Sequence, residues 1–142
     1  MIYFDTSYLA RLYVADTGWE KVRALAATDR VACSLHGKAE TIAAFHRKFR
    51  ERALLPPVFA GLLQQFESDC AAGAFEWLPV TPHVVGRVSK AHATLPATVP
   101  LRASDALHLA CATESGFKEI YSNDAHLLAG APFFELKAVN IF

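Results

Sequence analysis

Apolar residues recur along the chain in two patterns. Short runs rich in β-branched and aromatic residues, such as Met1 to Phe4, are typical of strands. Longer stretches repeat apolar residues every three or four positions, as Leu9 and Leu12 do, which is typical of helices. The pattern predicts strands over residues 1–4, 31–35, 75–80, 117–122 and 136–142, and helices over 6–15, 19–27, 37–55, 58–70, 83–94, 103–114 and 124–128.

The alternation of strands and helices indicates the fold class. Parallel strands need crossover connections, and these crossovers place helices on both faces of a sheet. We therefore expect an α/β fold with a central, mostly parallel β-sheet flanked by helices. The helix over 103–114 is apolar nearly all round, so we expect it at the centre of the domain. With 142 residues and no repeat or linker, the chain is expected to form a single domain over 1–142.

Composition narrows the class of protein further. Apolar residues make up 53% and charged residues 20%, which disfavours a disordered chain. The formal net charge of zero gives no overall basic excess for nucleic acid, so charge must be considered locally. Cys33, Cys70 and Cys111 are widely spaced in apolar surroundings, as reduced, packed cysteines are. No basic leader or membrane-length apolar run is evident, so we expect a cytoplasmic protein without a membrane span.

Acidic residues stand at unusual places in this pattern. Asp5 follows the first predicted strand, and Asp124 follows the predicted strand over 117–122. Ligands bind at the carboxyl ends of strands in open α/β sheets, so both carboxylates are expected at that edge. Glu40 lies near the start of an amphipathic helix, and Asp105 lies in the first turn of the most apolar one.

Each of these acids also has a local explanation. Asp105 and Asp124 could cap the helices that they begin, a contribution of roughly 0.5 to 2 kcal/mol. Glu40 could be a solvated glutamate in a first helical turn. Asp5 has the weakest local explanation, because Thr6-Ser7 already offers candidate caps for the same helix.

Converging carboxylates raise one another's pKa unless a cation compensates them. Mg²⁺ and Mn²⁺ prefer oxygen ligands, and Mg²⁺ usually binds one or two carboxylates together with waters and phosphate oxygens. Zinc would require histidine or cysteine at ligand spacing, and the histidines here are scattered. We expect His108 to be a hydrogen-bonded core residue, and His36 and His126 to lie near the edge without a paired partner. An acidic site of this kind indicates chemistry on phosphate esters.

Several segments together resemble a known family. They are MIYFDTSYLARLYV, KAETIAAFHRKFRE, RASDALHLA and IYSNDAHLL. In this order and spacing they resemble PIN-domain ribonucleases of the VapC toxin type, over essentially the whole chain. The resemblance implies a PIN-like three-layer fold and an acidic site that holds one or two Mg²⁺ or Mn²⁺ ions and cuts single-stranded RNA or exposed RNA loops. Carried over by position, the catalytic and metal-binding residues are Asp5, Glu40, Asp105 and Asp124.

The resemblance also suggests auxiliary roles. Asn123 adjoins the last acid and is a candidate auxiliary ligand. Thr6 would hydrogen-bond a metal-bound water or orient Asp5, and an equally good interpretation is that it caps the first helix. Metal ions that activate water and orient the phosphate make a protein nucleophile unnecessary.

Basic residues lie close to the predicted acids. Arg102 stands just ahead of Asp105 and is the candidate substrate contact. The run RKFRER over residues 47–52 is either a solvated helix face or a strip that follows RNA phosphates.

Partners follow from the same resemblance. Toxins of this type are usually held inactive by a cognate antitoxin, whose C-terminal segment lies in a hydrophobic groove and can send a basic side chain into the acidic pocket. We therefore expect an RNA substrate, a cognate antitoxin, and a homodimer or a dimer within a toxin-antitoxin complex. Phe45, Phe59 and Phe66 fit such partner surfaces, or equally the core.

Other interpretations place the acids differently. A haloacid-dehalogenase-like phosphatase requires a second acid two residues after Asp5, where Ser7 stands. A response-regulator receiver requires a lysine after a late strand, whereas Lys118 lies at the start of one. A non-catalytic, PIN-like binding module would use the acids to dock a basic partner peptide, and it would not cut RNA with Mg²⁺ or Mn²⁺.

Overall fold

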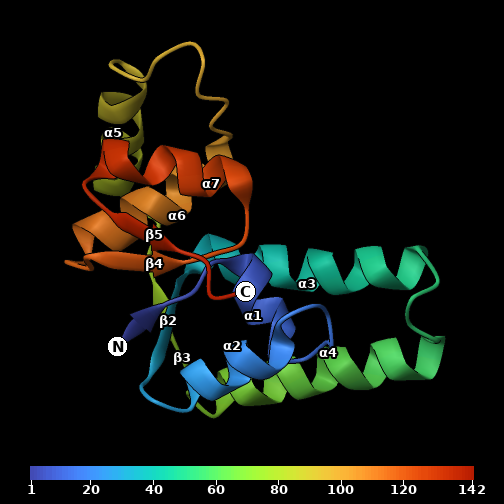
Figure 1. The fold of residues 1–142 in the computed structure, drawn as a ribbon. Coiled ribbons are helices and arrows are strands. Elements are labelled where there is room, and N and C mark those ends of the chain that lie inside the picture. Colours follow the sequence, from blue (N-terminus) through green and yellow to red (C-terminus); the bar gives the residue numbers. More distant parts are fainter.

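A computed structural model describes residues 1–142 and shows parallel strands between layers of helices (Figure 1). The strands are β1 (Ile2–Tyr3), β2 (Val31–Ser34), β3 (Phe75–Leu78), β4 (Glu119–Tyr121) and β5 (Lys137–Val139). The helices are α1 (Thr6–Arg11), α2 (Trp19–Ala26), α3 (Leu35–Arg50), α4 (Pro56–Ala71), α5 (Pro82–His92), α6 (Ala103–Glu114) and α7 (Ala125–Gly130), followed by the 3₁₀ helix η1 (Ala131–Phe134).

All strand pairings are parallel, which confirms the expected sheet. Strands β1, β2 and β3 are neighbours in that order, and β4 pairs with β5. A parallel bridge between Phe4 and Tyr121 joins the two groups, so the strand order across the molecule is β3-β2-β1-β4-β5. The chain builds outward from β1 to β3 on one side and then resumes at β4 on the other. The topological switch point, where α/β sheets bind ligands, therefore lies between β1 and β4.

The two faces of the sheet bury separate cores. Side chains alternate along a strand, so Tyr3 and Phe4 point to opposite faces. Tyr3 joins the core formed with α5, α6, α7 and η1, and Phe4 joins the core formed with α1, α2, α3 and α4. The expected three-layer arrangement is thus confirmed. Helices α3 and α4 form an antiparallel pair that extends beyond the sheet (Figure 1).

Helix α6 is the central helix that its apolar sequence predicts. It begins and ends where expected, and seven of its 12 residues are buried. Its small residues, including Ala106, Ala110 and Ala112, are completely buried and allow close approach of neighbouring elements. Despite this apolar character, neither α6 nor any other helix combines the length and hydropathy needed to cross a membrane.

The boundaries of other elements differ from the prediction for local reasons. Helix α1 ends at Arg11 rather than residue 15, because the chain turns there before left-handed Gly18. Helix α3 begins earlier, where Ser34 accepts a hydrogen bond from the Gly37 amide, and it ends earlier, before left-handed Arg52. The strands are shorter than predicted because only part of each predicted run pairs with a neighbouring strand. The 3₁₀ helix η1 was not predicted.

Gly37 allows α3 to lie close to β2 and α6. A Cβ atom at this position would lie 2.4 Å from Cys33 Sγ and 2.8 Å from His108 Cε1, both on buried residues. Gly37→Ala is therefore expected to lower the free energy of unfolding by about 1 to 3 kcal/mol in denaturant titration. The matched control is Gly61→Ala in α4, where a Cβ would meet nothing within 4 Å. That variant is expected to gain about 0.5 to 1 kcal/mol from helix propensity. Equal effects at both positions would contradict the close approach at Gly37.

Candidate functional site

Four acids from separate segments line a single pocket of about 440 Å³ at the carboxyl edge of the sheet. Asp5 follows β1, Asp124 follows β4, Glu40 lies in the second turn of α3, and Asp105 lies in the first turn of α6. The pocket is lined mainly by polar residues and lies at the switch point between β1 and β4. The fold thus brings together the acids that the sequence singled out.

Asp5 is almost completely buried, and the fold satisfies its carboxylate with hydrogen bonds. Ser7 Oγ donates to Oδ1 at 2.6 Å, the Tyr8 amide donates to Oδ1 at 3.1 Å, and Ser122 Oγ donates to Oδ2 at 2.5 Å. Burial raises the pKa of Asp5, while these donors and the nearby charge of His108 lower it less strongly. Asp5 is itself the N-cap of α1, so the expectation that Thr6 or Ser7 caps this helix was wrong.

Glu40 is held by side chains of two other helices. Thr6 Oγ1 donates to Glu40 Oε2 at 2.7 Å, and His108 Nε2 lies 2.8 Å from the same oxygen. Burial acts to raise the pKa of Glu40, but the contact with His108 and the bond from Thr6 outweigh it and lower the pKa to about 2. Burial likewise acts to lower the pKa of His108, but contacts with Cys33 and Glu40 raise it to about 10. Glu40 and His108 therefore form an ion pair at neutral pH.

Asp105 and Asp124 share one arginine. Arg102 binds Asp105 through Nε at 2.9 Å and through a terminal nitrogen at 3.2 Å, and the same terminal nitrogen lies 2.6 Å from Asp124 Oδ2. Asp124 also caps α7 by accepting from the His126 and Leu127 amides. Burial acts to raise the pKa of Asp124, but the hydrogen bonds from these backbone amides and the charge of Arg102 lower it overall. The predicted capping roles of Asp105 and Asp124 are thus present alongside their place in the pocket.

The oxygen-rich pocket suits a hard divalent cation by its chemistry. Its donors are carboxylates together with the side-chain oxygens of Thr6, Ser7 and Asn123, the ligand type that Mg²⁺ and Mn²⁺ prefer. As the side chains stand, no group of three or more histidine, cysteine, aspartate or glutamate residues is arranged to hold one ion. Arg102 and His108 supply positive charge to the acids instead. The pocket can therefore accept a metal ion, but the folded state does not need one to compensate all of its carboxylates.

Basic residues of α1 and α3 also line the pocket. Arg11 donates to the Ser7 and Thr17 carbonyl oxygens and to Asn123, and Lys48 forms an ion pair with Asp16 at 2.7 Å. Arg47 also lines the pocket, and its guanidinium forms no hydrogen bond or ion pair. From the run over 47–52, therefore, only the first two residues reach the acidic pocket.

The structure corrects the expectations for two polar residues near the acids. Thr6 neither caps α1 nor bonds Asp5, because its hydroxyl is directed to Glu40. His36 was expected to lack a partner, yet its Nε2 lies 3.1 Å from Ser104 Oγ and 3.4 Å from Glu40 Oε1. His108 is a hydrogen-bonded, buried residue, as expected.

Sequence reasoning missed several side chains that hold the acids. Ser7 and Ser122 bind Asp5, and His108 binds Glu40. The signal for the serines was available, since each lies within two residues of an acid at the end of a strand. His108 lies three residues after Asp105, a spacing that places both on one side of α6.

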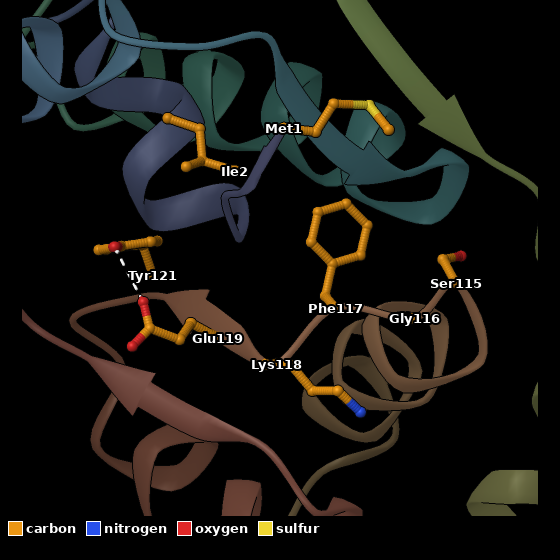
Figure 2. Close-up of a pocket in the computed structure, with 8 residues that line it drawn as sticks. All are labelled: Met1, Ile2, Ser115, Gly116, Phe117, Lys118, Glu119 and Tyr121. Carbon is orange, nitrogen blue, oxygen red and sulfur yellow. Dashed lines mark hydrogen bonds between the residues drawn. The ribbon is translucent and has the colours of Figure 1, made fainter.

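A second hollow of similar size lies at the opposite edge of the sheet. Figure 2 shows its lining around the starts of β1 and β4, and its volume is about 540 Å³. Glu119 is its only acid and is already bound by Lys137 at 2.7 Å and Tyr121 at 3.2 Å. The hollow therefore lacks the convergent polar groups of the acidic pocket, which remains the candidate site.

The aromatic residues considered for partner surfaces divide between core and surface. Phe45 and Phe66 are completely buried, whereas Phe59 is half-buried and stacks on Phe49 at a centroid distance of 4.8 Å. Phe45 and Phe66 therefore belong to the core and are not available to a partner.

Comparisons with known proteins agree with this architecture. A model of the PIN domain family matches residues 2–131. Mycobacterium tuberculosis VapC20, described as a sarcin-ricin loop cleaving toxin, has a similar fold with 20% identity and a TM-score of 0.69, over 96% of this chain and 99% of that chain. FitAcB from Neisseria gonorrhoeae is similar with 18% identity and a TM-score of 0.78, over 99% of this chain and 97% of that chain. A comparison with curated protein sequences found no match. Because the family model spans most of the sequence, the chain belongs to the PIN domain family.

Proposed function

We propose that this PIN-domain protein is a Mg²⁺- or Mn²⁺-dependent endoribonuclease that acts as the toxin of a toxin-antitoxin pair. The observation that carries the proposal is the convergence of four carboxylates in one pocket at the switch point of the sheet. Membership of the PIN family supports nuclease activity, and the similarity in fold to a protein described as a toxin supports the biological role.

The proposed metal-binding residues are Asp5, Glu40, Asp105 and Asp124, with Asn123 as an auxiliary ligand. A bound divalent ion would neutralise phosphate charge and make water more acidic. In the overall hydrolysis, water adds to phosphorus, one P–O ester bond breaks, and the released oxygen takes a proton. Ser7 and Ser122 keep the Asp5 carboxylate in one orientation during this reaction, because both hydroxyls donate to it.

Arg102 is the proposed substrate contact beside the acids. Its side chain is 59% exposed, so it is free to change rotamer. The guanidinium can then leave Asp105 and Asp124 and bind a phosphate oxygen. A cation bound to the same carboxylates would release Arg102 from them, because both compete for the same oxygens.

Arg47 is expected to bind RNA phosphate beyond the acids. Glu40, Ala44 and Arg47 line the same pocket and share one face of α3, since they are four and three residues apart. Arg47→Gln is expected to weaken RNA binding and to reduce the salt dependence of the affinity by about one phosphate contact. Fluorescence anisotropy at several salt concentrations, in EDTA to prevent cleavage, measures both. Arg50→Gln on the same helix is the control, and an equal loss in both variants would contradict a specific role for Arg47.

A cognate antitoxin is the proposed partner, with a homodimer or a dimer within the complex. The pairing of Arg102 with Asp105 and Asp124 supports this proposal, because it shows that the acids accept a guanidinium. Leu55, the N-cap of α4, and Val58, in its first turn, are 70% and 52% exposed and offer apolar surface for a partner.

The same pairing favours the second candidate function, a non-catalytic module that docks a basic peptide. Three of the four acids have a cationic partner without a metal, since Arg102 pairs with two of them and His108 with Glu40. RNA cleavage separates the two candidates, since the module would bind an arginine-rich peptide without cutting RNA.

The proposal is tested by incubating the purified protein with structured and single-stranded RNA in Mg²⁺, Mn²⁺ or EDTA. We expect discrete new RNA 5′ ends, mapped by sequencing, in either metal and none in EDTA. Cleavage that persists in EDTA would contradict metal dependence. The absence of cleavage on every RNA, with retained binding of a basic peptide, would favour the docking module.

A further inference from the structure

We propose that His108, together with Thr6 and Tyr3, is a positioning device that fixes Glu40 for metal binding. This inference rests on the proposed function, because it assigns residues that act through one of the proposed metal ligands. The four side chains come from β1, α1, α3 and α6, so the device links both layers of helices to the sheet.

Glu40 needs such support more than the other acids do. Asp5 and Asp124 have short side chains anchored at strand ends and helix N-termini, and Asp105 is braced in the first turn of α6. Glu40 projects from within a helix on a longer side chain, whose rotamers cost more entropy to fix. Its carboxylate reaches the pocket in a defined place only if neighbouring groups hold it.

Two donors hold the same carboxylate oxygen. Thr6 Oγ1 donates to Glu40 Oε2 at 2.7 Å, and His108 Nε2 lies 2.8 Å from Oε2 and 3.2 Å from Thr6 Oγ1. The Nε2 hydrogen is therefore shared between the carboxylate and the threonine oxygen. Oε2 is occupied, whereas Oε1 has a single contact, with His36 at 3.4 Å, and remains the oxygen available to an ion.

Tyr3 fixes the orientation of the imidazole ring. The Tyr3 hydroxyl accepts a hydrogen bond from the Ser34 amide at 3.1 Å and lies 3.0 Å from His108 Nδ1. A neutral ring whose Nδ1 accepts from Tyr3 and a charged ring whose Nδ1 donates to Tyr3 both carry a hydrogen on Nε2. In either state His108 donates to Glu40, so the orientation does not depend on how the ring is protonated.

Burial makes the arrangement rigid. Tyr3 is completely buried and His108 is 3% exposed, so water does not replace their hydrogen bonds. In metal sites, residues that hydrogen-bond to a ligand orient that ligand, and their loss typically lowers metal affinity or activity about 10- to 100-fold. The buried donors to Glu40 are expected to act in the same way.

The test compares His108→Leu, His108→Gln and Thr6→Val by calorimetric titration with Mn²⁺ alone. His108→Leu and Thr6→Val are expected to weaken Mn²⁺ binding about 10- to 100-fold, and His108→Gln, which keeps a donor, is expected to recover part of that loss. Thermal unfolding of each metal-free variant reports on stability separately. Thr6 is only partly buried, so Thr6→Val keeps the test decisive should His108→Leu fail to fold.

The outcomes separate this inference from the proposed function. If wild type binds Mn²⁺ and cuts RNA while the folded variants bind Mn²⁺ equally well, the positioning role is refuted and the proposed function stands. A loss of stability without a loss of Mn²⁺ affinity would show a purely structural network and would refute it as well. If wild type neither binds Mn²⁺ nor cuts RNA, the proposed function fails and the inference fails with it.

Discussion

Asp5→Asn is expected to reduce metal-dependent RNA cleavage by more than about 100-fold while leaving the protein folded. The expected loss exceeds the roughly 10- to 100-fold effect of removing an outer partner of a metal ligand, because Asp5 is itself a proposed ligand. Asparagine keeps the size of the side chain and an oxygen that can accept from the Tyr8 amide, so the cap of α1 is retained. The variant removes the charge and replaces one acceptor oxygen by an amide donor, so Ser122 must accept from the side chain instead of donating to it.

The fold is expected to tolerate this change because of where Asp5 lies. Burial raises the pKa of Asp5, which means that folding disfavours its charged form. A carboxyl whose pKa rises on folding destabilises the folded state at neutral pH, so removing the charge should offset the altered Ser122 contact and leave the melting temperature largely unchanged. Loss of cleavage in Asp5→Asn therefore reports on the site and not on stability.

Asp29→Asn is the matched control for the same chemical change. Asp29 is exposed and pairs with the terminal amine of Met1, away from the acidic pocket. Cleavage rates on one RNA, together with thermal unfolding, are to be measured for both variants. Undiminished cleavage by folded Asp5→Asn would refute the proposed site, whereas similar losses in both variants would indicate a nonspecific charge effect.

The location of the acidic edge could be predicted from sequence because it depends on chain order. Asp5 and Asp124 follow strands, and parallel strands deliver their carboxyl ends to one edge regardless of packing detail. The extent of α6 could also be predicted, since Pro100 precedes it, Gly116 follows it and apolar residues dominate its middle. Element ends elsewhere depended on single backbone conformations, such as the left-handed Arg52 that follows α3.

Two pairings of the acids could not be predicted, because they join residues far apart in sequence. Glu40 and His108 are 68 positions apart, and Arg102 and Asp124 are 22 apart. The hydropathy pattern does not indicate which residues the side chains of His108 and Arg102 contact. Converging acids predict a metal ion from sequence alone, whereas in the fold a histidine and an arginine supply part of the compensating charge.

Phe66→Ala is expected to lower the free energy of unfolding by about 3 to 5 kcal/mol. The side chain of Phe66 is completely buried in α4. It lies in edge contact with Tyr13 at 5.3 Å and Phe45 at 5.6 Å between ring centroids, and near Phe75 and Trp77 at 6.2 Å each. Removing the ring leaves a cavity among aromatic groups that cannot all move to fill it, and the expected cost is a large share of the roughly 5 to 15 kcal/mol that stabilises a domain.

Phe133→Ala provides the control, because this phenylalanine in η1 is 37% exposed. Phe133→Ala is expected to lower the free energy of unfolding by much less than Phe66→Ala does, since folding removes less of the Phe133 ring from water. Denaturant titration of both variants measures the difference. Equal, small losses would contradict the assignment of Phe66 to the core and restore it as a surface for a partner. A large loss at Phe66 alone would instead support its place in the core, where its ring contacts Phe45 of α3, the helix that carries Glu40 and Arg47.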